Sequence, residues 1–240
     1  MTGTIINIIA VLVGGGLGLL FGSRLPDRLK RTVMAGLGLF TAVTGIKMFL
    51  ETKNSLIVLG ALLVGALLGE WWRLEDGLQS LGQWLEKRFI GKKAESPENS
   101  AESRFVRGFL TASLLFCVGP MAILGSIQDG LTGNYNTLAI KSILDCFASL
   151  AFASTLGVGV LFSVLVILVY QGGISLLAAQ LNSVVTPAMM TEMTAAGGVI
   201  LLGIAISSLL ELKPIRVGNF LPALVMAPLI VAILAFLGIK

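Results

Sequence analysis

Apolar segments about as long as a lipid bilayer is thick follow one another along this chain, with short polar breaks between them. A helix that crosses the hydrocarbon core of a bilayer needs about 20 predominantly apolar residues. Hydrophobic residues make up 55% of the chain and charged residues only 12%, which is more apolar than water-soluble domains are. The repetition predicts an all-α polytopic membrane protein whose first partner is the lipid bilayer.

We expect about eight transmembrane helices. Their predicted ranges are Ile5 to Gly22, Thr32 to Leu50, Leu56 to Trp72, Phe105 to Leu124, Thr137 to Thr155, Val158 to Leu181, Met189 to Leu210 and Val217 to Leu237. The first range does not look like a secretory signal, because its basic cluster follows the apolar segment, whereas a signal peptide carries its positive charges in front.

The Lys and Arg residues test this count, because they concentrate in cytoplasmic connections. They cluster after the first predicted span (Arg24 to Arg31), after the third (Arg73 to Arg107) and after the seventh, at Lys213 and Arg216. Eight spans with both termini outside place all three clusters on one side. No basic stretch is interleaved with aromatic residues, so we expect no nucleic-acid partner despite the net charge of +4.

The third connection contains more than a loop. From Leu74 to Phe89, leucines recur at intervals of three or four residues, with charged residues on the other faces. This spacing predicts an amphipathic helix on the cytoplasmic membrane surface. The polar segment from Gly91 to Ser103 that follows has the composition of a flexible linker.

Two segments near opposite ends of the chain have a similar residue pattern. Small and large residues match position by position between Gly14 to Leu20 in the first span and Gln171 to Leu177 in the sixth. A genuine echo indicates an inverted repeat of two three-helix units, as in many secondary transporters. Chance similarity between glycine-rich spans is the alternative.

Small residues recur every four positions on two spans, at Gly14, Gly18 and Gly22 and from Ala61 to Gly69. Such faces let helix backbones approach closely. They either pack the core of one subunit or form a homodimer.

Polar residues inside the spans carry the most information about function, because a charged side chain in the bilayer centre is costly. Lys141 and Asp145 lie one helical turn apart in the fifth span, with Ser142 nearby. The pair either locks this helix against its neighbours or forms a site. In the second case, Asp145 binds a proton or cation, and Lys141 sets its pKa or meets an anionic substrate.

The fourth span breaks at Gly119-Pro120, where proline removes a backbone donor. The polar stretch from Met121 to Gly133 is then either an outer loop or, as we favour, a re-entrant segment. The further candidate residues for binding a solute or ion are Ser126, Gln128, Asp129, Gln171 and Asn219.

These features divide the chain into four parts. Residues 1-73 form the first three-span unit, and 74-103 form the surface helix and linker. Residues 104-156 form a central polar helix pair, and 157-240 form the second three-span unit.

An enzyme is not expected. The chain has no histidine, which excludes Ser-His and Cys-His nucleophile pairs and His-based zinc motifs. Cys117 and Cys146 lie in apolar runs, where cysteine behaves as a small hydrophobic residue. We therefore predict no cofactor, metal site or disulfide.

Several stretches resemble one bacterial family. Gly119 to Leu131, Lys141 to Asp145, Tyr170 to Gly173 and Arg216 to Leu224 are similar to the family of domain of unknown function 554, whose members are called YdfK-like or YqgA-like membrane proteins. The resemblance covers nearly the whole chain. It implies a multi-pass protein of the bacterial inner (cytoplasmic) membrane, and it brings no substrate or catalytic residue with it.

The function favoured by these residues is secondary transport of a small solute or ion by alternating access, with a proton or sodium as coupling ion. The observations behind it are the echo, the broken spans and the Lys141–Asp145 pair. A membrane scaffold or regulatory protein and a passive ion channel are the alternatives.

Overall fold

The computed structural model describes residues 1–22, 26–89 and 103–237, and all regular structure in these ranges is helical. The α-helices are α1 (Thr2–Gly22), α2 (Asp27–Phe49), α3 (Ser55–Trp72), α4 (Leu74–Phe89), α5 (Arg104–Cys117), α6 (Pro120–Thr132), α7 (Asn136–Leu156), α8 (Ser163–Leu176), α9 (Ala178–Val184), α10 (Pro187–Ile204) and α11 (Ala223–Phe236). Three short turns join them, namely the 3₁₀ turns η1 (Val158–Phe162) and η3 (Val217–Phe220) and the π turn η2 (Ala205–Leu209).

Seven helical segments of the described chain are long and apolar enough to cross a membrane, and the bent pair α5–α6 makes an eighth if it counts as one span. The all-helical membrane architecture is therefore confirmed. The sixth span ends earlier than expected, because α8 stops at Leu176 and the short helix α9 follows.

The bent pair is the main departure from straight spans. The chain bends by 63° between its two helices. Gly119 is extended, with φ −151° and ψ 146°, and Pro120 opens α6. Proline suits the first position of a helix and cannot continue a preceding one, so the chain stops α5 and starts α6 here.

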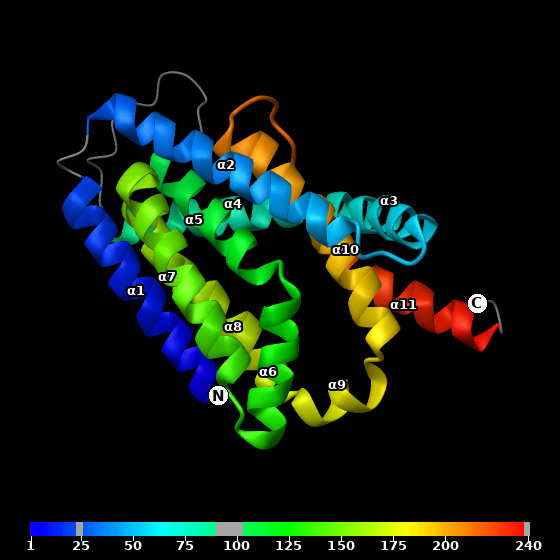
Figure 1. The fold of residues 1–240 in the computed structure, drawn as a ribbon. Coiled ribbons are helices and arrows are strands. Elements are labelled where there is room, and N and C mark those ends of the chain that lie inside the picture. The colour runs from blue at the N-terminus through cyan, green and yellow to red at the C-terminus, as the bar shows by residue number, and fades with distance from the viewer. Residues whose placement is uncertain (23–25, 90–102, 238–240) are drawn as a thin grey trace.

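The segment from Met121 to Gly133 is helical almost to its end, where Gly133 closes α6 with a φ of +69°. At the other end of the pair, Arg104 contacts the carbonyl of Thr155, in the last turn of α7. The pair thus runs beside α7 from end to end (Figure 1). This course favours the second half of a broken span over a re-entrant segment or an irregular outer loop.

The helices pack in two groups. The first bundle consists of α1, α5, α6, α7 and α8, and the second bundle consists of α2, α3, α10 and α11. Each bundle contains helices from both expected three-span units, so those units interleave in space.

Glycines allow the closest helix contacts in both bundles. A Cβ atom on Gly14 or Gly18 would lie 2.1 or 2.2 Å from a backbone oxygen of α7, so α1 and α7 touch through their backbones. On α3, a Cβ atom on Gly65 would lie 2.5 Å from the nitrogen of Ala223, and one on Gly69 would lie 1.9 Å from the oxygen of Asn219. Both small-residue faces are thus used within the chain and are not available to a second copy.

Helix α4 covers the range expected for the amphipathic helix. Leu85 is buried against Phe105 and Phe109 of α5, whereas Trp84 and Phe89 remain exposed. Its position relative to a membrane stays a prediction. Of the expected linker, residues 91–102 lie outside the described residues.

A cavity of about 390 Å³ separates parts of the two bundles. Ser113, Cys117 and Tyr170 line it from the first bundle, and Met193 and Leu224 line it from the second. Its walls are mostly apolar, so the bundles are not packed tightly against each other along their whole length.

Candidate functional site

A buried cluster of polar side chains lies inside the first bundle, where α1, α7 and α8 meet. Its members are Asn7, Lys141, Asp145 and Gln171, and none of them is more than 7% exposed. Side chains of this kind are rare inside apolar spans, and they usually face a partner or a pathway.

Helix α7 supplies the charged pair. Lys141 and Asp145 are one turn apart, and the Lys141 Nζ donates to Asp145 Oδ2. Neighbours at this spacing face each other on a helix surface. Asp145 is the tenth of the 21 residues of α7, so the pair lies near the middle of a membrane-spanning helix.

Asn7 joins this pair to α8. Its Nδ2 donates to Asp145 Oδ2 over 3.0 Å and to Gln171 Oε1 over 3.3 Å. One amide group therefore connects three helices. Among the described residues, Asn7 Oδ1 and Gln171 Nε2 have no hydrogen-bond partner although both are buried. Buried polar atoms are normally satisfied, so the cluster retains both an acceptor and a donor for a ligand.

The cluster borders the break between α5 and α6. Lys141 Nζ lies 5.8 Å from the centre of the Phe116 ring, in the last turn of α5, which is close enough for a cation–π contact. Proline at position 120 leaves the carbonyl of Phe116 without its helical donor. The Lys141 ammonium group thus lies over the ring of a residue at the helix break.

A second carboxylate contacts the same face of α1. Asp129 Oδ2 accepts from the backbone N–H of Gly3 over 3.0 Å and pairs with the amino group of Met1, also at 3.0 Å. Gly3 is one turn before Asn7, so Asp129 lies about one turn from the cluster. Its Oδ1 is buried without a partner among the described residues.

Two of the candidate serines turn toward their own helices. Ser126 Oγ donates to the Ala122 carbonyl over 2.5 Å, and Ser142 Oγ donates to the Leu138 carbonyl over 2.6 Å. Both hydroxyls are therefore already hydrogen-bonded within their own helices, although both residues are buried in the first bundle.

The last two candidates lie elsewhere. Gln128 Oε1 accepts from Thr137 over 2.8 Å, next to the connection between α6 and α7. Asn219 Nδ2 donates to Glu70 over 2.5 Å, and its Oδ1 accepts from the backbone N–H of Glu75 over 2.9 Å. Asn219 thus joins η3 to the junction of α3 and α4, outside the first bundle.

Asn7 is a member of the cluster that was not predicted from the sequence. The available signal was a lone amide in an otherwise apolar helix of 21 residues. Glu192 is also absent from the predicted candidates, yet it is buried. It accepts from Thr52 Oγ1 over 2.5 Å and from the Lys53 N–H over 2.8 Å, which fixes the connection between α2 and α3.

The polar groups of the cluster are one carboxylate, one ammonium group and two amides. Across the described ranges, no group of three or more His, Cys, Asp and Glu residues is placed to hold a metal ion. The cluster is suited to a proton, a monovalent cation, or a small solute with both a charge and hydrogen-bonding groups.

Comparison of this chain with known proteins finds one family model and two relatives. The model of the family described as "Protein of unknown function (DUF554)" matches residues 2–232. The chain is 33% identical over 225 residues to the uncharacterized protein YqgA of Escherichia coli (strain K12), covering 94% of each chain. It is 28% identical over 244 residues to the uncharacterized membrane protein YdfK of Bacillus subtilis (strain 168), covering all of both. No solved structure matches.

The relative named as a membrane protein and the succession of apolar helices lead to one conclusion. The chain is an integral, multi-pass helical membrane protein.

Proposed function

Because this chain belongs to the DUF554 family of proteins of unknown function, no activity is transferred to it, and we propose from its own structure that it is a secondary transporter. The cargo is a small solute or ion, and the coupling ion is a proton or sodium. The observation that carries the proposal is the buried, incompletely satisfied cluster around the Lys141–Asp145 pair, beside a break in a helix pair.

Transporters place their binding sites near the bilayer midplane and build them from discontinuous helices. Asp145 lies near the middle of α7, and the break between α5 and α6 lies next to Phe116, which the Lys141 ammonium group approaches. A charge pair that only locked α7 against its neighbours would have no need of two neighbouring amides with unpartnered buried atoms. These features support a site that exchanges a proton or ion with a solute.

Alternating access also requires two bodies that move relative to each other. The first and second bundles meet around the cavity of about 390 Å³, to which Cys117 belongs. Cys117 directly follows Phe116, the neighbour of Lys141. The cavity therefore supports a route from the bundle interface toward the cluster.

The inverted repeat belongs to the same proposal. Where α2 crosses α10, a Cβ atom on Gly45 would meet the Gly198 oxygen at 2.5 Å and the Leu202 nitrogen at 3.0 Å. A Cβ atom on Gly198 would meet the Gly45 oxygen at 2.4 Å and the Phe49 nitrogen at 2.8 Å. The two sets of neighbours are reciprocal, which supports a two-fold relation between the second helix of each unit.

The test is to measure currents from proteoliposomes during concentration jumps of candidate solutes, namely amino acids, carboxylates and inorganic cations. We expect a current from the wild-type protein that Asp145→Asn abolishes and Gln171→Met reduces. Gln171→Met leaves the ion pair in place, so it reports on the cluster when loss of Asp145 alone impairs folding. Asp76→Asn is the matched control, because Asp76 pairs with Arg73 at the exposed junction of α3 and α4.

A wild-type current that Asp145→Asn leaves unchanged would refute the role of Asp145. Discrete single-channel conductance steps would instead establish a passive channel. A scaffold or regulatory role is the second candidate, because α4 exposes Trp84 and Phe89 on a helix whose other face packs on α5. That role predicts no current for any solute in the panel.

A further inference from the structure

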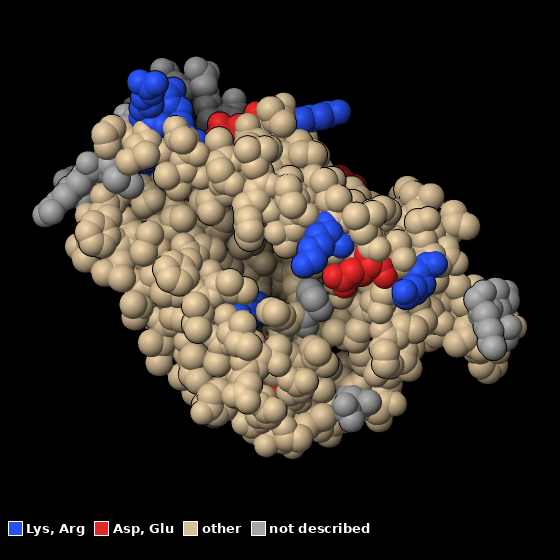
Figure 2. Space-filling view, in the orientation of Figure 1, with Lys and Arg blue, Asp and Glu red and all other residues tan. Residues whose placement is uncertain are grey.

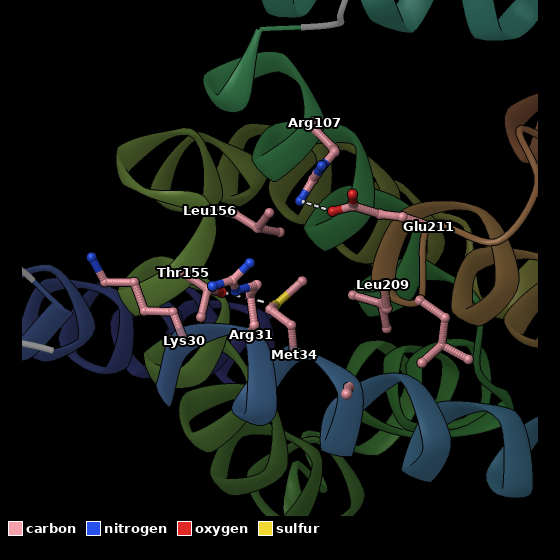
Figure 3. Close-up of a pocket in the computed structure, with 10 residues that line it drawn as sticks. Lys30, Arg31, Met34, Arg107, Thr155, Leu156, Leu209 and Glu211 are labelled. Atoms are coloured by element: carbon pink, nitrogen blue, oxygen red, sulfur yellow. Dashed lines mark hydrogen bonds and ion pairs between the residues drawn. The ribbon is translucent and has the colours of Figure 1, made fainter. Parts of the chain in front are cut away.

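A second kind of site lies at the ends of the helices, away from the buried cluster. A cavity of about 320 Å³ opens where the first turns of α2, the start of α5, the end of α7 and the segment after η2 meet (Figure 3). Its lining residues are Lys30, Arg31, Met34, Ala35, Arg107, Thr155, Leu156, Leu209, Leu210 and Glu211.

Cations dominate the polar part of this cavity. Lys30, Arg31 and Arg107 contribute three positive charges, and Glu211 contributes one negative charge. Arg107 Nη2 pairs with Glu211 Oε1 at 2.7 Å, while the Arg107 Nε is buried without a partner among the described residues. Basic residues therefore outnumber acidic ones in the lining, and the Arg107 Nε is a buried donor without a partner among the described residues.

A second cavity, of about 330 Å³, shares Lys30 and Leu156 with the first. It adds Arg104, whose Nε donates to the Thr155 carbonyl over 2.8 Å and thereby caps the end of α7. The guanidinium group of Arg104 therefore already has a partner within the chain. In Figure 2, Lys and Arg gather over the N-terminal end of α2, whereas the lower part of the view is nearly free of charged side chains.

Lys30 and Arg31 are the fourth and fifth residues of α2, and both line the first cavity. Ammonium and guanidinium groups form strong, charge-assisted hydrogen bonds with phosphate oxygens. Basic side chains that share a cavity are therefore suited to a phosphate group.

The remaining walls are apolar. Met34, Leu209 and Leu210 line the first cavity, and Leu19 and Val158 line the second. A cationic rim above an apolar wall matches an amphiphile with a phosphate at its head and acyl chains below. Basic pockets between transmembrane helices on the cytoplasmic side bind anionic lipid headgroups in this way.

We propose that the paired cavities around Lys30, Arg31 and Arg107 bind a phosphate-bearing anionic headgroup. The shared chemistry is a phosphate held by ammonium and guanidinium groups, and the source is either an anionic phospholipid or phosphate from the aqueous phase. Basic residues that only fix the orientation of a membrane protein have no need of a cavity or of a buried guanidinium donor, which separates this proposal from the positive-inside rule.

The test uses the full chain in phosphatidylcholine nanodiscs, without and with added phosphatidylglycerol, and measures bound lipid by native mass spectrometry after gentle release. A separate arm titrates inorganic phosphate into pure phosphatidylcholine nanodiscs and follows thermal unfolding. The test variant is Lys30→Gln/Arg31→Gln. The matched control, Lys47→Gln/Lys53→Gln, removes two exposed charges outside both cavities.

We expect retained phosphatidylglycerol on the wild type and the control. Each lost charge near the site weakens binding by about fivefold, so the test variant should bind about 25-fold less tightly at low salt. Stabilisation by inorganic phosphate that is lost in the test variant, with no lipid retained, would assign the site to phosphate from water. Equal losses in both double variants, or no loss in either, would overturn the proposal.

Arg31→Glu provides a second variant if the double substitution lowers expression, because Arg31 is exposed and a reversed charge at the rim needs no repacking. It should abolish retention of the anionic lipid while leaving the unfolding temperature in pure phosphatidylcholine unchanged. Retention equal to that of the wild type would count against the proposal.

Discussion

At the scale of single residues, Asn7 decides whether the buried polar groups act as one cluster. Its side chain is fully buried, and its Nδ2 reaches both Asp145 and Gln171. Without it, Asp145 keeps only the Lys141 contact, and Gln171 loses the donor that holds its carbonyl oxygen. Interhelical hydrogen bonds in membrane proteins contribute about 0.6 kcal/mol each, with a maximum near 1.7.

Asn7→Ala should therefore lower the free energy of unfolding by about 1 to 2 kcal/mol, since two such bonds disappear together. Unfolding of the purified protein in mixed micelles with increasing SDS measures this change. Asn134→Ala is the matched control, because Asn134 is exposed between α6 and α7 and bonds only locally, to the Asn136 N–H. Equal stability of Asn7→Ala and wild type would show that Asn7 does not hold the cluster together.

The sequence predicts local residue relations and misses distant ones. That Lys141 and Asp145 face each other follows from helical spacing alone. Their meeting with Asn7 and Gln171 depends on how α1 and α8 pack on α7, which no periodicity within one helix specifies. For the same reason Asn219 looked like a member of the site, although its partners are Glu70 and Glu75.

At the scale of helices, the contact between α1 and α7 depends on which glycines face the partner. A Cβ atom on Gly18 would lie 2.2 Å from the Leu150 oxygen, whereas one on Gly16 would meet nothing within 4 Å. Gly18→Ala must push the two helices apart and should destabilise the protein by about 1 to 3 kcal/mol. Gly16→Ala should be neutral or stabilising by up to about 1 kcal/mol, because alanine favours the helix.

The two variants carry the same substitution at different positions. Effects of composition or expression are therefore the same in both and do not contribute to the difference in stability between them. Thermal unfolding in one detergent, measured side by side, gives the difference directly. Comparable melting temperatures for Gly18→Ala and Gly16→Ala would contradict the backbone contact between α1 and α7.

Helix positions were more predictable than helix breaks. The ranges of α1, α3 and α7 follow from apolar length, and the predicted ends differ from the observed ones by at most three residues. The bend between α5 and α6 was foreseen as a break at Gly119-Pro120. Its outcome, a second helix that continues along α7, depends on tertiary packing against α7 and α8.

At the scale of the whole molecule, the number of crossings and the orientation are linked through the bent pair. The distribution of basic residues predicts that the connection at 91–102 lies inside and the N-terminus outside. If α5 and α6 together cross the membrane, the chain makes eight crossings and its C-terminus is also outside. If the pair enters and returns on the same side, seven crossings remain and the C-terminus lies inside.

Fusions of alkaline phosphatase, which is active only outside, and of green fluorescent protein, which fluoresces only inside, distinguish these cases. We expect an active phosphatase after Lys240 and after a truncation at Asn134, and fluorescence from insertions between residues 91 and 102. Fluorescence at both Asn134 and Lys240 would show that the pair does not cross, and the broken-span interpretation would then be wrong. The Asn134 fusion carries the most weight, because it follows α6 directly and does not depend on the four later spans.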